Sequence, residues 1–179
     1  IEDGAYQSLR YDGEAIPPLL AMEIAKKGDI DQCRTIYCGT FSKTLSPGLR
    51  VGWVCAAKDI VSRLVILKQA GDLHSATINQ AAMNAVAREM FDEQVAAIRK
   101  VYGGRRDHML AALKREMPEG VSWSRPEGGM FVWLTLPEGM DGAMLLAPGR
   151  AARATSAATP IIMSTWKANS PTCTARKRR

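Results

Sequence analysis

The sequence predicts an α/β region followed by an α+β region, with a long helix between them. In the first region, stretches rich in β-branched and aromatic residues alternate with stretches whose apolar residues recur at helical spacing. The second region has two apolar stretches around a turn rich in proline and glycine. Residues 76–102 contain neither proline nor glycine and carry apolar residues at helical spacing. Alternating strands and helices are typical of an α/β layer structure, and a strand pair after helices is typical of an α+β one.

The α/β region opens with residues 1–6, which are typical of a strand end and the loop that leaves it. A helix is expected over residues 19–27, with Gly28 as its C-cap. Residues 35–41 and 49–56 indicate two strands. The second of these strands is apolar on both faces, which indicates a sheet that is covered on both sides.

The later elements follow from glycine positions and apolar spacing. Gly103 and Gly104 are expected to end the long helix, because glycine is a poor helix former. Phe131 and Trp133 are expected to lie in the core of the second region. The expected helices cover residues 58–70, 76–102 and 105–117, and a hairpin is expected over 121–123 and 130–136.

The net charge of +6 comes from the end of the chain. No acidic residue follows Asp141, whereas seven lysines and arginines do, so residues 1–141 carry 17 basic and 18 acidic groups. The charge therefore does not indicate a nucleic-acid partner for the folded part. Residues 142–179 are expected to form an irregular or disordered basic tail. A change of reading frame near Gly142 to Ala147 would explain the shift in composition, and a native disordered tail is the alternative.

The sequence favours a cytoplasmic protein with no membrane span. No apolar run approaches the ~20 residues that a spanning helix needs, and the first residues lack the pattern of a signal peptide. The four cysteines have neither metal-site spacing nor the context of a disulfide framework, so free, buried or partly buried thiols are expected. No metal site is predicted.

The densest chemical signal is the segment Gly39–Gly52, where a lysine just past a strand lies between hydroxyl residues and an arginine. Thr40 and Ser42 can donate hydroxyl hydrogen bonds to a phosphate ester, and Arg50 can give it a bidentate, charge-assisted pair. Lys43 stands where its amine can form a Schiff base with an aldehyde. The segment therefore predicts a site that holds a phosphate beside a reactive amine.

This segment resembles the Schiff-base motif of the class I/II aminotransferases, which are fold type I enzymes that use pyridoxal 5′-phosphate (PLP). Within the family it is most similar to the 2-aminoadipate and kynurenine aminotransferases. The resemblance implies that Lys43 binds PLP covalently and then moves a proton between the substrate α-carbon and the cofactor. It also implies that Thr40, Ser42 and Arg50 contact the phosphate. The implied activity transfers an amino group between an α-amino acid and a 2-oxo acid, usually in a homodimer.

The opening residues resemble the pyridine-binding loop of the same family. The resemblance implies that Asp3 pairs with the pyridinium nitrogen of PLP and keeps the ring a good electron sink. It implies that Tyr6 donates a hydrogen bond to the phenolic oxygen. Taken alone, an aspartate three residues before a tyrosine is a weak signal, for which a turn and a packed ring are the usual explanation. Its place one strand–helix–strand unit before Lys43 favours the cofactor role.

The resemblance covers residues 1–141 and implies an incomplete enzyme. A phosphate loop, an aromatic residue that stacks on PLP and the arginine that binds the substrate carboxylate are not recognisable in the chain. We therefore expect the chain alone to fold poorly and to bind PLP weakly. The implied parts are the end of the PLP-binding large domain over 1–75, the interdomain helix over 76–102 and part of the small domain over 103–141.

Two other functions are compatible with the same motif. One is the aminotransferase-like effector domain of a winged-helix transcription regulator, which would bring a nucleic-acid partner. The other is a related PLP lyase, which would share Asp3, Lys43 and Arg50. A winged helix before Ile1 would indicate the regulator, and turnover without a 2-oxo acid acceptor would indicate the lyase.

Overall fold

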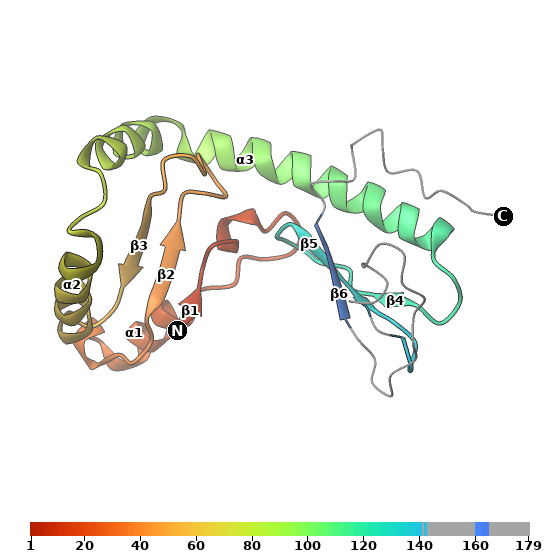
Figure 1. Cartoon of the computed structure of the whole chain (residues 1–179), viewed down its shortest axis with the longest axis horizontal. Coiled ribbons are helices and arrows are strands. Elements are labelled where there is room, and N and C mark those ends of the chain that lie inside the picture. The colour runs from red at the N-terminus through yellow and green to blue at the C-terminus, as the bar shows by residue number, and fades with distance from the viewer. Residues whose placement is uncertain (141, 143–159, 165–179) are drawn as a thin grey trace. The chain divides into compact units, whose positions relative to one another are not determined.

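The computed structural model of the protein describes residues 1–140 and 142 and, for the backbone, 160–164 (Figure 1). The chain divides into two compact units, residues 1–99 and 100–179. Helix α3 (Thr77–Glu116) contributes residues to both units. Among the described residues, no helix is long and apolar enough to cross a membrane.

The first unit contains a three-stranded sheet in the order β1-β2-β3. β1 and β2 are parallel, and α1 lies on the connection between them, so this part is a strand–helix–strand unit. β2 and β3 are antiparallel, and the loop that joins them contains Lys43. The elements are β1 (Glu2–Asp3), η1 (Gln7–Leu9), α1 (Leu19–Lys27), η2 (Ile30–Gln32), β2 (Tyr37–Thr40), β3 (Gly52–Cys55) and α2 (Lys58–Asp72).

Helix α1 begins and ends as the sequence predicts. At its end, Gly28 adopts a left-handed conformation (φ 80°) and donates its backbone N–H to the Ile24 carbonyl. At its start, the carboxylate of Glu2 accepts from the N–H groups of Leu19 and Leu20, at 2.8 and 3.2 Å. The first strand therefore satisfies helix amides that have no partner within the helix.

Glu23 on α1 fixes the chain where it enters β2. Its carboxylate accepts from the backbone N–H groups of Arg34 and Thr35 at 3.0 to 3.1 Å, and from Lys27 Nζ. The hydrogen bond from Lys27, followed by those from Thr35 and Arg34, lowers the pKa of Glu23 from 4.5 to about 2. The carboxylate therefore stays charged through the mildly acidic range.

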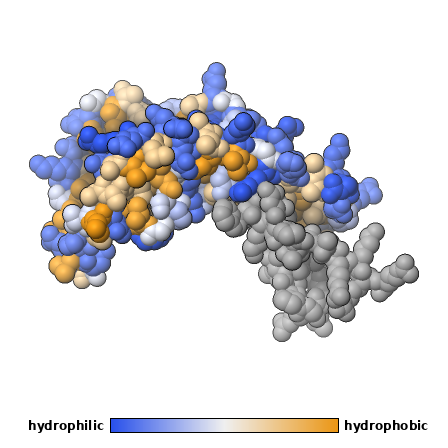
Figure 2. All heavy atoms as spheres, turned by 90° about the horizontal axis from the view of Figure 1, so that it is seen from above, coloured by the Kyte–Doolittle hydropathy of each residue, from blue (hydrophilic) through white to orange (hydrophobic). Residues whose placement is uncertain are grey.

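The first unit buries only part of its apolar surface. Its buried residues include Leu9, Leu20 and Met83, whereas all of β3 is exposed. The expectation that β3 lies in a covered sheet is therefore wrong for the described residues, in which Trp53 and Val54 are 41% and 44% exposed. Figure 2 shows apolar side chains among polar ones on one face of the molecule.

The second unit packs α3 against a sheet in the order β4-β5-β6, in which both pairs are antiparallel. Its core contains Met109 and Leu113 of α3 and Val132 and Leu134 of β5. Residues alternate between the two faces of a strand, so Phe131 and Trp133 lie on the other face and are 42% and 46% exposed. Their expected place in the core is therefore wrong. The strands are β4 (Ser122–Trp123), β5 (Phe131–Thr135) and β6 (Pro160–Ser164).

Helix α3 runs without a break through Gly103 and Gly104, where the sequence analysis expected an end. On both sides of this glycine pair, α3 carries buried residues at helical spacing, namely Tyr102, Arg106 and Met109. Arg106 also donates a hydrogen bond through Nη1 to the Pro126 carbonyl at 2.9 Å. Burial of this face outweighs the low helix propensity of two glycines, about 1 kcal/mol each.

The end of the chain contains one element that the sequence analysis missed. Pro160–Ser164 forms β6 and pairs with β5 over its whole length, where an irregular tail was expected. Residues 141, 143–159 and 165–179 lie outside the described part, so the rest of the expected tail, Cys173 included, lies there too.

Replacing Gly104 should stabilise the protein. An added Cβ at this helical position meets no atom within 4 Å, so Gly104→Ala should raise the free energy of unfolding by about 0.5–1 kcal/mol. Gly28→Ala is the matched control, because its positive φ disfavours a Cβ and should lower that free energy by about 1 kcal/mol. Urea unfolding measures both changes. A loss of stability on Gly104→Ala would contradict the continuous helix.

The charge on Glu23 should make stability depend on pH in a defined window. Because the folded-state pKa of Glu23 is depressed to about 2, its contribution to the free energy of unfolding is fully present above pH 4.5 and is lost as pH falls through about 2. The difference in stability between the unmutated protein and Glu23→Gln should therefore shrink as the pH falls from 4.5 to about 2. Thermal unfolding at several pH values measures it, with Glu14→Gln as a control for the loss of one exposed negative charge. A difference that stays constant over this range would contradict the prediction.

Candidate functional site

The loop between β2 and β3 is folded back on itself around Phe41. The Phe41 N–H donates to the Val51 carbonyl at 3.2 Å, which brings the two ends of the loop together. The Phe41 carbonyl accepts from the N–H groups of Thr44, Leu45 and Ser46 at 2.9 to 3.2 Å. Lys43 therefore sits in a tight turn that backbone hydrogen bonds of its neighbours hold.

Two hydroxyl groups lie at the entrance of this turn. Thr40 Oγ1 accepts from the Ser42 N–H at 3.1 Å and lies 3.0 Å from Ser42 Oγ and 3.2 Å from the Val51 carbonyl. When the Thr40 hydroxyl donates to Ser42 Oγ, the Ser42 hydroxyl hydrogen is free for another acceptor. In that arrangement the Ser42 hydroxyl can donate to an anionic oxygen.

Arg50 leaves the loop in a left-handed conformation, with φ at 53°. This region is disfavoured for residues with a Cβ by roughly 1–2 kcal/mol, so the flanking contacts must hold the backbone there. Its guanidinium is exposed and donates to the Pro47 carbonyl through Nη1 at 3.3 Å. The remaining guanidinium N–H groups give this loop a second kind of donor beside the hydroxyls.

The predicted pyridine-binding residues lie beside this loop. Asp3 ends β1 and pairs in register with Cys38 of β2, two residues before Thr40. One carboxylate oxygen of Asp3 accepts from the Ala5 N–H at 3.1 Å, which leaves its other oxygen for a ligand. Lys43 Nζ lies 5.6 Å from the centre of the Tyr6 ring. Tyr6 and Lys43 therefore lie close together, and Asp3 ends a strand that pairs with the strand leading into the lysine loop.

Two glycines allow these elements to approach closely. A Cβ on Gly39 would overlap the Trp53 indole, and a Cβ on Gly4 would overlap the Tyr37 hydroxyl. The Tyr37 hydroxyl donates to Gln7 Oε1 at 2.8 Å. Burial raises the pKa of Tyr37, and the nearby negative charges of Glu2 and Asp3 raise it further.

Sequence reasoning missed two residues that support the site. Tyr37 was placed in a strand without a role, although it packs directly against the glycine after Asp3. Asn79 lies in the predicted long helix, where no role was assigned to it, and its side-chain amide donates to the Leu49 carbonyl at 3.1 Å. Neither contact can be predicted from neighbouring residues, because each joins segments that are far apart in the sequence. Gly4 contacts Tyr37, and Leu49 and Asn79 are 30 residues apart.

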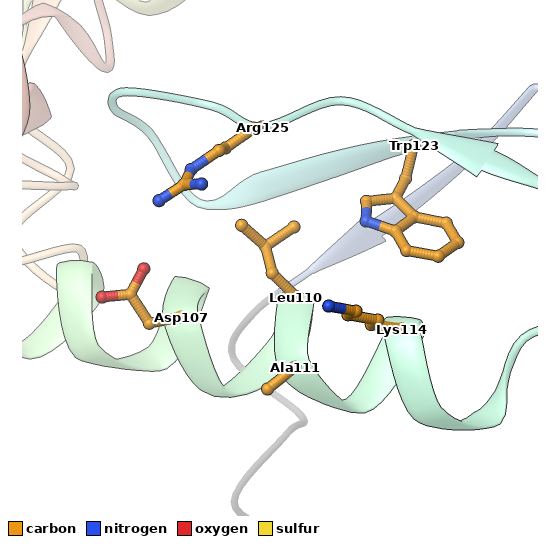
Figure 3. A pocket seen from close by; sticks show the side chains of 6 residues that line it. All are labelled: Asp107, Leu110, Ala111, Lys114, Trp123 and Arg125. Atoms are coloured by element: carbon orange, nitrogen blue, oxygen red, sulfur yellow. The ribbon is translucent and has the colours of Figure 1, made fainter.

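A cleft of about 430 Å³ lies in the second unit, between α3 and the hairpin (Figure 3). Lys114 and Arg125 give it positive charge beside the Trp123 indole. Its one carboxylate, on Asp107, is paired with Arg106 at 2.8 Å. The side chains that line this cleft include the Lys114 amine but no hydroxyl group, so the loop around Lys43 is the better match for a phosphate ester beside a reactive amine.

In the described part of the chain, cysteines and metal-binding side chains form no second candidate site. Cys33 is buried, Cys38 is partly buried and Cys55 is exposed, and all three are free, so the expectation of buried or partly buried thiols is wrong for Cys55. No group of three acidic, histidine or cysteine residues among the described residues could hold a metal ion.

The two threonines of the loop should respond differently to replacement by valine. Thr40→Val leaves the Ser42 N–H without its acceptor and should cost about 1–3 kcal/mol of unfolding free energy. The Thr44 hydroxyl is buried and has no hydrogen-bond partner among the described residues, so Thr44→Val should be neutral or stabilising by about 1 kcal/mol. Urea unfolding compares the two variants, and equal losses would contradict the hydrogen bonds described here.

The chain is similar to known aminotransferases over most of its length. It is 44% identical to an aromatic-amino-acid aminotransferase of Thermococcus litoralis over 147 residues, 82% of this chain and 34% of the relative. The crystal structure of LysN, an α-aminoadipate aminotransferase of Thermus thermophilus, matches with a TM-score of 0.74 and 40% identity over 80% of this chain and 36% of LysN. That structure contains N-(5′-phosphopyridoxyl)-L-leucine. The chain thus spans about a third of the length of these relatives.

A relative of another class also matches. The HTH-type transcriptional regulator YdfD of Bacillus subtilis, described as uncharacterized, is 36% identical over 141 residues, which are 76% of this chain and 27% of the regulator. Similarity over this segment therefore does not by itself distinguish an enzyme from an effector domain.

The family model for "Aminotransferase class I and II" matches residues 1–162, which extends the family resemblance beyond Asp141, where the sequence analysis ended it. The mixed α/β structure confirms the predicted fold, a part of the fold type I architecture. From the lysine loop, its neighbouring strands and these matches together, the chain belongs to the class I and II aminotransferase family.

Proposed function

We propose that this chain is the part of a PLP-dependent aminotransferase that carries the cofactor lysine and the phosphate contacts. The enzyme transfers an amino group between an α-amino acid and a 2-oxo acid. The observation that carries the proposal is the loop closed by the Phe41–Val51 hydrogen bond, because it gathers an amine, two hydroxyls and a guanidinium on one short segment.

The donor set of this loop fits PLP. A phosphate ester accepts hydrogen bonds and carries negative charge, which matches the hydroxyls of Thr40 and Ser42 and the guanidinium of Arg50. Lys43 offers a primary amine to an aldehyde. Asp3 has a carboxylate oxygen free of the Ala5 contact for a protonated ring nitrogen. Each polar part of PLP thus has a chemically matched partner among the described residues.

The residues divide the catalytic work. Bound PLP supplies an electron sink that stabilises negative charge at the substrate α-carbon. Lys43 holds the cofactor through its amine and, once released, its Nζ takes and returns the α-proton. The carboxylate of Asp3 keeps the ring nitrogen protonated, and the Tyr6 hydroxyl donates to the phenolic oxygen. Thr40, Ser42 and Arg50 anchor the phosphate while Lys43 is free.

The proposed substrates are aromatic or 2-aminoadipate-like amino acids with a 2-oxo acid acceptor. The names of the aromatic-amino-acid aminotransferase and of LysN support this class. We further propose a homodimer, for which the exposed apolar residues of the first unit, among them Trp53 and Val54, provide surface to bury. A cytoplasmic location is proposed because the three described cysteines are free thiols, as is usual in a reducing compartment.

A regulator effector domain is the second candidate, favoured by the match to YdfD. An effector domain needs to bind PLP but not to turn over amino acids. A PLP lyase is the third candidate, and its turnover needs no 2-oxo acid. Repeated product formation that depends on the acceptor therefore separates the transaminase from both alternatives.

Lys43→Ala tests the proposal in the full-length protein that contains this chain. The unmutated protein should develop a visible absorption band with PLP that borohydride bleaches, and Lys43→Ala should abolish the band. Amino-group transfer should fall at least about 100-fold, because a positioned general base contributes that much or more. Exposed Lys58→Ala is the control and should change neither readout. A full band in Lys43→Ala would exclude Lys43 as the cofactor lysine.

A further inference from the structure

Asn79 makes a contact that joins the start of α3 to the lysine loop. Its side-chain nitrogen Nδ2 donates to the Leu49 carbonyl at 3.1 Å. The orientation of the amide follows from chemistry, because the amide oxygen is an acceptor only and could not bond to a carbonyl. The side chain is partly buried and its partner is 30 residues earlier in the sequence. The contact is therefore a tertiary link within the first unit.

The partner of Asn79 is the residue just before Arg50. On the other side of Arg50, the Val51 carbonyl accepts from the Phe41 N–H and lies 3.2 Å from Thr40 Oγ1. Both carbonyls that flank Arg50 are thus held, one by the loop itself and one by Asn79. Between these two fixed points Arg50 adopts its left-handed φ of 53°. A strained backbone persists only where the surroundings determine it, and these two contacts do so.

The neighbour of Asn79 shows that the contact is not ordinary helix capping. Gln80 also has a side-chain amide in the first turn of α3, but its Nε2 donates to the Ser75 carbonyl at 2.9 Å, five residues away. Gln80 therefore binds the backbone just before its own helix, whereas Asn79 binds the lysine loop. The pair provides a natural control, since both are amide donors on the same helical turn.

We propose that Asn79 is a positioning residue for the phosphate contact of Arg50. By holding the Leu49 carbonyl, it keeps the Arg50 backbone left-handed and so keeps the guanidinium in place for the phosphate. This inference rests on the proposed function, since it assumes that Arg50 binds the phosphate of PLP. It goes beyond that function because Asn79 is not among the residues proposed to hold the cofactor. Its effect should therefore be specific to ligands that carry a phosphate.

The test compares PLP with pyridoxal, which has the same aldehyde and ring but no phosphate. In the full-length protein, Asn79→Ala should weaken equilibrium binding of PLP about 3- to 10-fold, the usual effect of one lost hydrogen bond, and pyridoxal by less than about twofold. Asn79→Leu, which keeps a similar shape, lacks the donor and adds no charge, should behave alike. Gln80→Ala should leave both affinities within about twofold. The inhibition constant of inorganic phosphate, measured by its competition with PLP, should be higher for Asn79→Ala than for the unmutated protein.

A double-mutant cycle asks whether Asn79 acts through Arg50. In an Arg50→Gln background, Asn79→Ala should cause no further loss of PLP affinity, because the group that it positions is gone. Equal weakening of PLP and pyridoxal, or additive losses in the cycle, would overturn the inference and make Asn79 a purely structural residue. If Asn79→Ala lowers the melting temperature of the apo-protein, Asn79→Ser, which retains a donor, provides the second variant for the same comparison.

The two proposals fail in different ways. If the unmutated protein forms no borohydride-sensitive band at Lys43, the proposed function fails and this inference fails with it. If that band forms and Arg50→Gln weakens PLP more than pyridoxal, but Asn79→Ala affects neither ligand, only the positioning role of Asn79 is wrong.

Discussion

The site depends on one backbone hydrogen bond, from the Phe41 N–H to the Val51 carbonyl. It extends the antiparallel pairing of β2 and β3 by one step and closes the loop between them. An open loop would present its amine, hydroxyls and guanidinium in sequence order along a flexible chain. The closed loop presents them together, so the ordering entropy is already lost before a ligand binds. Two glycines, Gly39 and Gly4, serve the same end by letting bulky side chains pack against neighbouring backbone.

Elements with local signals could be predicted from the sequence. Helix α1 has the predicted bounds, because Gly28 supplies a left-handed cap within the helix's own sequence neighbourhood. The hairpin of β4 and β5 was predicted from its apolar stretches and its turn. The lysine loop was recognised because its amine, hydroxyls and arginine lie within a dozen residues. In each case the physical cause of the structure is contained in the segment that was read.

Features that depend on distant packing could not be predicted. The two glycines in α3 indicate a break, but buried Tyr102 and Arg106 on either side keep the helix continuous. The face on which Trp133 lies depends on which face of β5 the helix covers, and one strand's sequence, apolar on both faces, does not decide this. The hydrogen bond from Asn79 to Leu49 likewise joins segments with no sequence signal in common.

The first strand assigns two adjacent carboxylates to different tasks. Successive side chains of a strand point to opposite faces, so Glu2 meets the amides at the start of α1 while Asp3 lies on the other face. The role of each acid therefore depends on the face of the strand on which it lies, because both carry the same carboxylate group. A slip of a single residue against β2 that moved Glu2 into the place of Asp3 would leave Ile1 at the start of α1 and would present the longer acidic side chain on the other face. A strand of only two residues thus requires one particular alignment with its neighbour.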